Sequence, residues 1–387
     1  MKFLRTLILL LLILPVATPA QDTSQSAPLA PPASILDTPA DFAGWTGEAA
    51  DPARFDTIRI GFFAPDRPDD PIGVPMRNAA MLALDQVNAA GGYHGVPVGL
   101  IQRWSDNPWG AGSKKMIRLV YEDSVWAVIG SLDGAFTHIA EQIVTKAWVP
   151  LLSPVSADPT LNYVRIPWMF RLPPGDDKQA AVIVRHGLQT RSLERIGLIT
   201  STDHDGRIFA KEMLDQLNTA GRPPLFHFKI SLSNVDLREI ASRALLFQPD
   251  AIILRFPGEA TRKLVTSLDE NSANIPLFLP WIPGLQRADL TARYHGEIHS
   301  VQPFRMDDNP RYAGFAKIYR KHYGQSPTPT AAYTYDALQL VLKALKASGL
   351  TRAGIRGAVA GMSGFQGVTG TIRWDNGWAN QGEPVLE

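Results

Sequence analysis

The chain has 387 residues, and its 38 Lys and Arg residues nearly balance 37 Asp and Glu residues, which leaves a formal net charge of +1. This balance excludes the basic footprint that binding to nucleic acids or anionic membranes requires, and the absence of cysteine excludes disulfides, a thiolate nucleophile and a cysteine-ligated metal. A chain of this length exceeds what one hydrophobic core usually organises, so two domains are expected.

The first twenty residues have the pattern of an export signal. Lys2 and Arg5 precede the apolar run 7–14, and small residues stand at the −3 and −1 positions of a cleavage site after Ala20. The apolar run is too short to span a membrane. We therefore expect residues 1–20 to be a cleaved signal peptide. The cleavage site lacks the cysteine that a lipid anchor needs, so no stable membrane anchor is expected and the mature protein should diffuse in the periplasm.

Residues 21–57 are rich in Ala, Pro and Ser without a steady period, which predicts a flexible leader. From residue 58 onward, strands and helices alternate in two series. The first series predicts strands at 58–63, 98–104, 126–130 and 149–153 and helices at 76–90, 112–123 and 139–148. The second predicts helices at 177–188, 207–220, 237–247 and 259–268 and strands at 195–200, 224–230, 251–255 and 276–279. A late helix at 331–347 and a late strand at 367–374 follow.

Strands that alternate with helices indicate parallel sheets covered on both faces. Two such series predict an α/β fold of two doubly wound parallel-sheet lobes joined by a multi-strand hinge. We expect lobe I to comprise residues 58–172 plus 303–366, and lobe II residues 173–302 plus 367–387. Several chain crossings between the lobes would let them close without drifting apart.

No motif in the sequence carries catalysis. The segment 130–134 lacks the G-x-S-x-G order of a nucleophile elbow, and the glycine-rich segment 110–115 matches neither a P-loop nor a dinucleotide fingerprint. His295 and His299 lack the H-E-x-x-H order of a zinc site. The sequence therefore predicts no enzyme, no metal site and no cofactor.

The loops that follow the predicted strands form the candidate binding site. In open α/β sheets, ligands bind beyond the carboxyl ends of the strands, where helix N-termini present free N–H groups. These loops are 66–73, 106–110, 131–136 and 153–159 in the first lobe and 201–207, 256–259 and 281–284 in the second. The alternative is local capping, because Asp133, Ser156, Asp158 and Asp205 are all good helix N-cap residues.

Several short segments, in their order and spacing, resemble one family. They are Asn88 to Gly95, Val128 to Gly130, Val149 to Pro154, Asp205 to Arg207, Ala332 to Leu338 and Gly370 to Asp375. Through them the chain resembles the type I periplasmic binding proteins, in particular the Leu/Ile/Val-binding subfamily that serves ABC importers. The resemblance covers roughly residues 58–378. It implies two lobes that trap a small molecule between them.

The resemblance also implies where a ligand would lie. Family members hold an amino acid by hydroxyls and helix-terminal amides, and an acidic residue of the second lobe holds its ammonium group. At the positions of the family's serine, threonine and tyrosine this chain has Gly134, Ala157 and Asp205, and the acidic position falls near Trp281. The expected ligand-binding residues are Asp133, Gly134, Ala135, Phe136, Val155, Ser156, Ala157, Asp205, Phe256 and Trp281.

The sequence thus predicts a monomeric solute-binding protein that captures an amino-acid-like or aromatic or apolar acid and delivers it to the permease of an ABC importer. The alternative is a periplasmic ligand sensor or accessory protein that signals to a membrane partner without transport. The loops do not distinguish the two functions.

Overall fold

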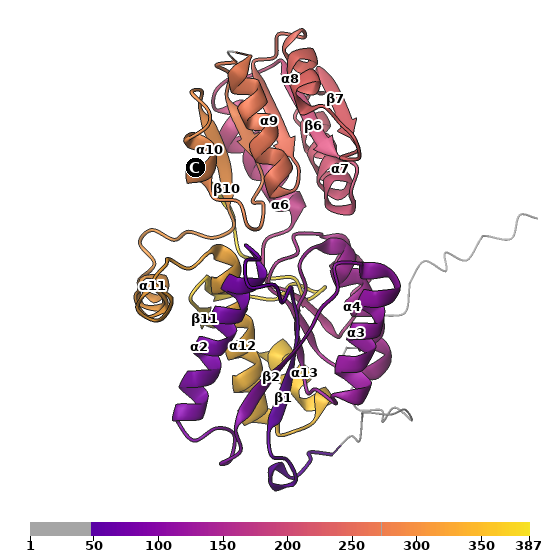
Figure 1. Cartoon of the computed structure of the whole chain (residues 1–387), viewed down its shortest axis with the longest axis vertical. Coiled ribbons are helices and arrows are strands. Elements are labelled where there is room, and N and C mark those ends of the chain that lie inside the picture. The colour runs from indigo at the N-terminus through magenta and orange to yellow at the C-terminus, as the bar shows by residue number, and fades with distance from the viewer. Residues whose placement is uncertain (1–47, 272) are drawn as a thin grey trace, which may run out of the picture. The chain divides into compact units, whose positions relative to one another are not determined.

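The computed structural model describes residues 48–271 and 273–387 (Figure 1). The predicted signal peptide and leader residues 21–47 lie outside the described residues. Within the described part, none of the helices is both long and apolar enough to cross a membrane.

The first lobe contains a five-stranded parallel sheet with the strand order β2-β1-β3-β4-β5. Its strands are β1 (Ile58–Phe63), β2 (Val98–Arg103), β3 (Val128–Gly130), β4 (Leu151–Ser153) and β5 (Met169–Arg171). Alternate side chains point to opposite faces of a strand. Phe62 and Phe63 accordingly belong to two different buried clusters. A strand buried on both faces needs a nearly continuous apolar run, which β1 provides apart from the exposed Arg59.

Helices cover both faces of this sheet (Figure 1). On one face lie α2 (Gly73–Ala89), α12 (Pro329–Ser348) and α13 (Arg352–Gly361), whose apolar residues share the cluster of Phe62. On the other lie α3 (Ser113–Ile117), α4 (Gly134–Ala147) and the π-helical turn η3 (Arg118–Glu122). The first lobe also contains the helical segments η1 (Pro52–Arg54), η2 (Pro108–Gly112), α5 (Thr160–Tyr163) and α11 (Pro310–Tyr323).

The second lobe contains a six-stranded sheet with the order β13-β10-β9-β8-β6-β7, in which only β13 pairs antiparallel. Its strands are β6 (Ile196–Ser201), β7 (Phe226–Ile230), β8 (Ala251–Arg255), β9 (Leu277–Leu279), β10 (Ile298–Gln302) and β13 (Val385–Leu386). One face packs against α6 (Asp176–Val182), η4 (Ile183–Gln189) and α7 (His204–Thr219). The other packs against α8 (Leu237–Leu245), α9 (Gly258–Glu270) and α10 (Arg287–Thr291).

In the described part, the chain passes between the two sheets three times. It leaves the first lobe after β5, returns after β10, and reaches the second sheet again at β13. This arrangement confirms the predicted α/β fold of two doubly wound lobes. The domain boundaries stay a prediction: Ile372 and Trp374 pack in the cluster of Ile58, whereas Leu386 pairs with Val301 of the second sheet.

The prediction of one continuous strand over 367–374 is wrong. The structure has a two-stranded hairpin instead, of β11 (Phe365–Gly367) and β12 (Gly370–Ile372). The turn is held by Asp336 of α12, whose carboxylate accepts hydrogen bonds from the amides of Val368 and Thr369 at 2.8 and 2.9 Å. Gly370 has a φ of 112°, a conformation that favours glycine, so the chain reverses here rather than continuing as one strand.

Candidate functional site

A cavity of about 300 Å³ lies at the carboxyl ends of strands from both sheets. The first lobe contributes residues from the loop after β3 and from the start of α2, and the second contributes residues that end or follow β6, β8 and β9. The lining residues are Ile72, Leu132, Asp133, Ala135, Asp203, His204, Asp205, Arg255, Pro257, Gly258, Ile282 and Pro283. The cavity therefore has apolar walls and a group of charged side chains contributed by both lobes.

The N-terminus of α4 forms one side of this cavity. Asp133 caps the helix, and its Oδ1 accepts a hydrogen bond from the amide of Phe136 at 2.8 Å. The amide of Gly134 instead donates across the lobes to Oδ1 of Asp205 at 3.0 Å. A Cβ atom at Gly134 would lie 2.7 Å from that oxygen and 2.8 Å from Oδ2 of Asp158, so the approach requires glycine.

Arg255 ends strand β8 and is buried at the cavity wall. Its Nη2 lies 3.3 Å from Oδ2 of Asp205, and its Nη1 donates to the carbonyl of Phe256 at 3.2 Å. Among the described residues, the buried Nε of Arg255 has no hydrogen-bond partner. A buried donor without an acceptor carries a desolvation cost.

Two carboxyl groups at the cavity have raised pKa values. Burial raises the pKa of Asp133 to about 7, and the negative charge of Asp205 adds to the effect. Burial also raises the pKa of Asp205, against the lowering effects of the Arg255 charge and the Gly134 amide. Burial and the nearby negative charge of Asp205 therefore both favour the protonated form of Asp133.

A second group of titratable side chains lies beside the cavity. Oδ2 of Asp158 is 3.1 Å from Nε2 of His138 on α4 and 2.6 Å from Nε2 of His204 on α7. Burial would lower the pKa of His138, but its contacts with Asp158 and Glu141 outweigh burial and raise it to about 9. The hydrogen bond to Asp158 raises the pKa of His204. Asp158 itself is buried, which favours its neutral form, yet the two imidazoles hold its pKa below the usual range.

The structure brings some of the predicted site residues together. Asp133, Ala135 and Asp205 line the cavity, and Gly134 reaches it through its amide. The other first-lobe candidates lie elsewhere. Phe136 stacks on Trp104 with ring centroids 4.4 Å apart.

The predicted 155–157 segment does not line the cavity. Val155 packs in the first-lobe core, the hydroxyl of Ser156 accepts a hydrogen bond from the amide of Asp158 at 3.3 Å, and the carbonyl of Ala157 accepts one from the amide of Asp176 at 2.8 Å. These residues therefore support the loop that carries Asp158 rather than the cavity itself.

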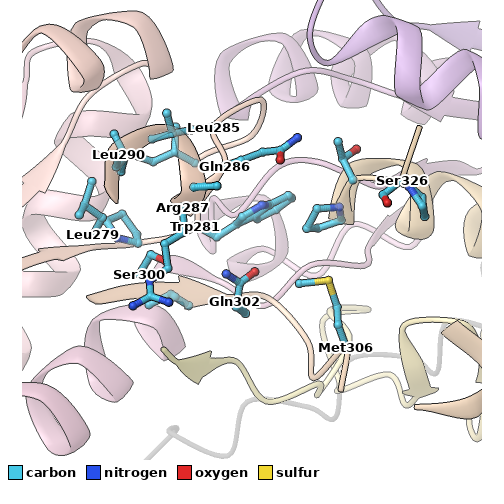
Figure 2. Close-up of a pocket in the computed structure, with 17 residues that line it drawn as sticks. Leu279, Trp281, Leu285, Gln286, Arg287, Leu290, Ser300, Gln302, Met306 and Ser326 are labelled. Carbon is cyan, nitrogen blue, oxygen red and sulfur yellow. The ribbon is translucent and has the colours of Figure 1, made fainter. Parts of the chain in front are cut away.

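The predicted aromatic residues of the second lobe are also placed outside this cavity. Phe256 is fully buried in the second-lobe core. Trp281 lines a separate cavity of about 240 Å³, together with Gln302 and Met306 (Figure 2). Its amide donates to Gln179 at 2.7 Å.

Arg255 and His204 line the cavity but are not among the residues expected from the sequence. Arg255 could have been found, because it is the one charged residue of the otherwise apolar strand β8. His204 lies within a loop that the strand pattern indicated, but no feature of the sequence separates it from its neighbours.

Comparison with known proteins agrees with this architecture. A family model described as "Periplasmic binding protein" matches residues 57–385. A curated relative from Pseudomonas aeruginosa, "Amino acid binding protein", is 24% identical over 166 residues, which is 42% of this chain and 44% of the relative. The aligned region thus spans less than half of that relative's length.

Solved structures share the fold. The branched-chain amino acid transporter substrate-binding protein LivJ from Streptococcus pneumoniae, in complex with isoleucine, has a TM-score of 0.75 at 22% identity and covers 84% of this chain and 93% of its own. A solute-binding protein of an ABC transporter from R. palustris, in complex with benzoate, has a TM-score of 0.75 at 18% identity and covers 85% of this chain and 92% of its own. At these identities the likeness shows the fold.

Proposed function

The chain belongs to the periplasmic binding protein family, as its sequence resemblance predicted, and from this premise we propose that it captures a small organic acid between its lobes and delivers it to an ABC importer. The observation that carries the proposal is the cavity itself, which has apolar walls and the buried guanidinium of Arg255 in its lining. The protein would act in the periplasm after removal of its signal peptide, and would leave its solute chemically unchanged.

The cavity favours an acid over a zwitterionic amino acid. An ammonium group needs a free carboxylate partner when it is buried. Asp205 is already committed to the Gly134 amide and the Arg255 guanidinium, and Asp133 and Asp203 each cap a helix. A solute carboxylate would instead pair with the positive charge of Arg255, whose guanidinium belongs to the cavity lining, through a charge-assisted hydrogen bond.

The apolar walls suit the body of the solute. Ile72, Leu132 and Ile282 line the cavity from both lobes, and burial of apolar surface is worth about 25 cal/mol per Å². The benzoate and 3,4-dihydroxybenzoic acid bound to two structural neighbours have this combination of an apolar ring and a carboxylate. We therefore propose an aromatic or apolar carboxylic acid as the solute class.

Closure of the lobes would provide the signal for delivery. A ligand shifts a conformational equilibrium only by its differential affinity for the two states. A solute that contacts Ala135 of the first lobe and Arg255 of the second gains both contacts only when the lobes are closed. The closed form would then be the one that docks on the permease.

The proposal is tested by measuring solute binding to the native protein and to a variant in which a tryptophan side chain fills the cavity. Native mass spectrometry of freshly purified protein would identify a retained solute, and calorimetry would rank benzoate, 3,4-dihydroxybenzoate, isoleucine and leucine. The Ala135→Trp variant should lose binding because the indole occupies the cavity. Ala288→Trp places the same side chain in the other cavity and should retain it.

Two results would overturn the proposal: equal binding by Ala135→Trp and the native protein, or tighter binding of leucine and isoleucine than of the aromatic acids. Delivery is tested separately by pull-down from membranes. Recovery of an ABC permease supports transport. Recovery of a sensor kinase without a permease would show that the protein signals to a membrane partner and does not deliver the solute.

A further inference from the structure

His138, Asp158 and His204 lie far apart in the sequence, yet their ligand atoms all lie within 4.8 Å of one another. From this geometry we infer a binding site for a divalent transition-metal ion of the Zn²⁺ class that connects the two lobes. Two imidazole nitrogens and one carboxylate oxygen are a donor set that such ions prefer, with a fourth position left for water. The site is distinct from the solute cavity, which it adjoins through His204.

The distances suit a tetrahedral ion after small rotations. Ligand bonds of about 2.0–2.1 Å place neighbouring ligand atoms about 3.3 Å apart. Oδ2 of Asp158 lies 3.1 Å from Nε2 of His138 and 2.6 Å from Nε2 of His204, somewhat closer than an ion would place them. Both imidazoles are only half-buried, with side-chain exposures of 30% and 28%, so they can turn to admit the ion.

The carboxylate is oriented in advance. Oδ1 of Asp158 accepts hydrogen bonds from the amide of Thr160 at 2.8 Å and from its hydroxyl at 2.7 Å. These two bonds leave Oδ2 facing the two imidazoles. Because the Asp158 side chain is 1% exposed, its charge is shielded from water and is stabilised by positive charge at Oδ2. The two imidazoles supply that charge when protonated, and a bound ion would supply it in place of their protons.

One imidazole also has the outer support that metal-binding histidines usually have. Nδ1 of His138 lies 3.3 Å from Oε2 of Glu141, one turn further along α4. A carboxylate behind a ligating histidine fixes its tautomer and strengthens it as a ligand. Glu141 is buried, and its other oxygen, Oε1, has no hydrogen-bond partner among the described residues.

The ion would hold the lobes together. His138 and Asp158 belong to the first lobe, and His204 is the first residue of α7 in the second. A ligand that binds only the closed arrangement stabilises it by mass action. The metal would therefore favour the closed form even without a solute in the cavity.

The test uses the purified full chain after treatment with a chelator. Zinc chloride is titrated by calorimetry, and Co²⁺ is added to record the visible absorption of a tetrahedral site. We expect one ion per chain. His204→Gln and His138→Gln should each weaken zinc binding by more than the 10- to 100-fold that loss of an outer contact typically costs, and Glu141→Gln by about that smaller factor.

His295→Gln is the matched control, because His295 also pairs with a carboxylate, Asp269 at 2.9 Å, but is 92% exposed. It should bind zinc as the native protein does. Circular dichroism verifies that each variant is folded, and small-angle scattering should show zinc-dependent compaction in the native protein and not in His204→Gln. Zinc affinity that is undetectable in the native protein, or unchanged in both His204→Gln and His138→Gln, would overturn the inference.

Discussion

The carboxylate of Asp205 accepts a hydrogen bond from the amide of Gly134 at 3.0 Å, so a side chain of the second lobe lies at the N-terminus of a first-lobe helix. Helix N-termini favour anions because their amides are free and the helix dipole is positive there. Asp205 thus occupies a position where a solute carboxylate would be stabilised, and its second oxygen lies near Arg255.

Asp205→Ala should raise the affinity for aromatic carboxylates by about tenfold, since it frees the Gly134 amide and the Arg255 guanidinium for the solute. The same change should lower thermal stability in the absence of solute, because Arg255 is left buried without a carboxylate. Calorimetry and thermal melting measure the two effects. Asp215→Ala, which removes an exposed carboxylate from the same helix, is the control. A fall in affinity would mean that Asp205 binds a donor of the solute.

Arg255→Gln should weaken binding of the acid by about 10- to 100-fold, because a hydrogen bond to a charged group contributes about 1.5–3 kcal/mol. Arg262→Gln provides the comparison. Arg262 is also in the second lobe, but its contacts are Glu259, Asp289 and the carbonyl of Gly284. Equal affinities of the two variants in calorimetry would contradict a role of Arg255 in binding.

Gly134→Ala should hold the lobes apart. The added methyl group would meet two second-lobe atoms, Oδ1 of Asp205 and Cδ2 of His204, each at 2.7 Å and well inside van der Waals contact. Solute affinity and the compaction seen by small-angle scattering should both decrease. Gly314→Ala makes the same change in α11, where nothing lies within 4 Å, and should leave both unchanged. Normal compaction of Gly134→Ala would show that the lobes close without this contact.

Asp336 should make stability depend on pH. Burial raises the pKa of Asp336 to about 6, from 3.8, although its hydrogen bonds with Thr369 and Val368 oppose the shift. The folded state therefore retains a proton that the unfolded state releases. The stabilisation is complete below pH 3.8 and is lost as pH rises through 6.

Urea unfolding of the native protein and Asp336→Asn from pH 4 to pH 7 measures this effect. Relative to the variant, the native protein should lose about 2 kcal/mol of unfolding free energy over that range. Asp307→Asn, at an exposed position, should show a pH profile parallel to that of the native protein. A parallel profile for Asp336→Asn would contradict the prediction.

The fold could be predicted from the sequence because its central strands, such as β6 and β8, are buried on both faces. The apolar runs predicted 58–63 and 251–255 with the bounds that β1 and β8 have. Helix starts were less accurate. The apolar period predicted a helix over 139–148, but in the structure this helix begins five residues earlier, at Gly134. The reason is that Asp133 is its N-cap.

The site was predicted only in part, for reasons that the geometry explains. Asp133, Ala135 and Asp205 line the cavity, as expected from the loops that follow the strands. Neighbouring residues of an extended chain point to opposite sides. At the end of β8, Arg255 faces the cavity and Phe256 lies in the core.

The cluster of His138, Asp158 and His204 could not be predicted, because helix α4, the loop before α5 and the start of α7 are brought together only by tertiary packing. Each residue alone is unremarkable in the sequence.

The path of the chain also has a kinetic consequence. Strands β6 to β10 pair with one another before the chain leaves the second sheet, so nearly all of that lobe is present once residue 302 has been translated. The core of the first lobe needs α12, which follows more than 150 residues after β5. Contacts between distant segments form slowly because loop closure precedes them. During folding, the amides of the second lobe should therefore become protected from hydrogen exchange first. The amides of the first lobe should become protected later, when α12 packs on its sheet.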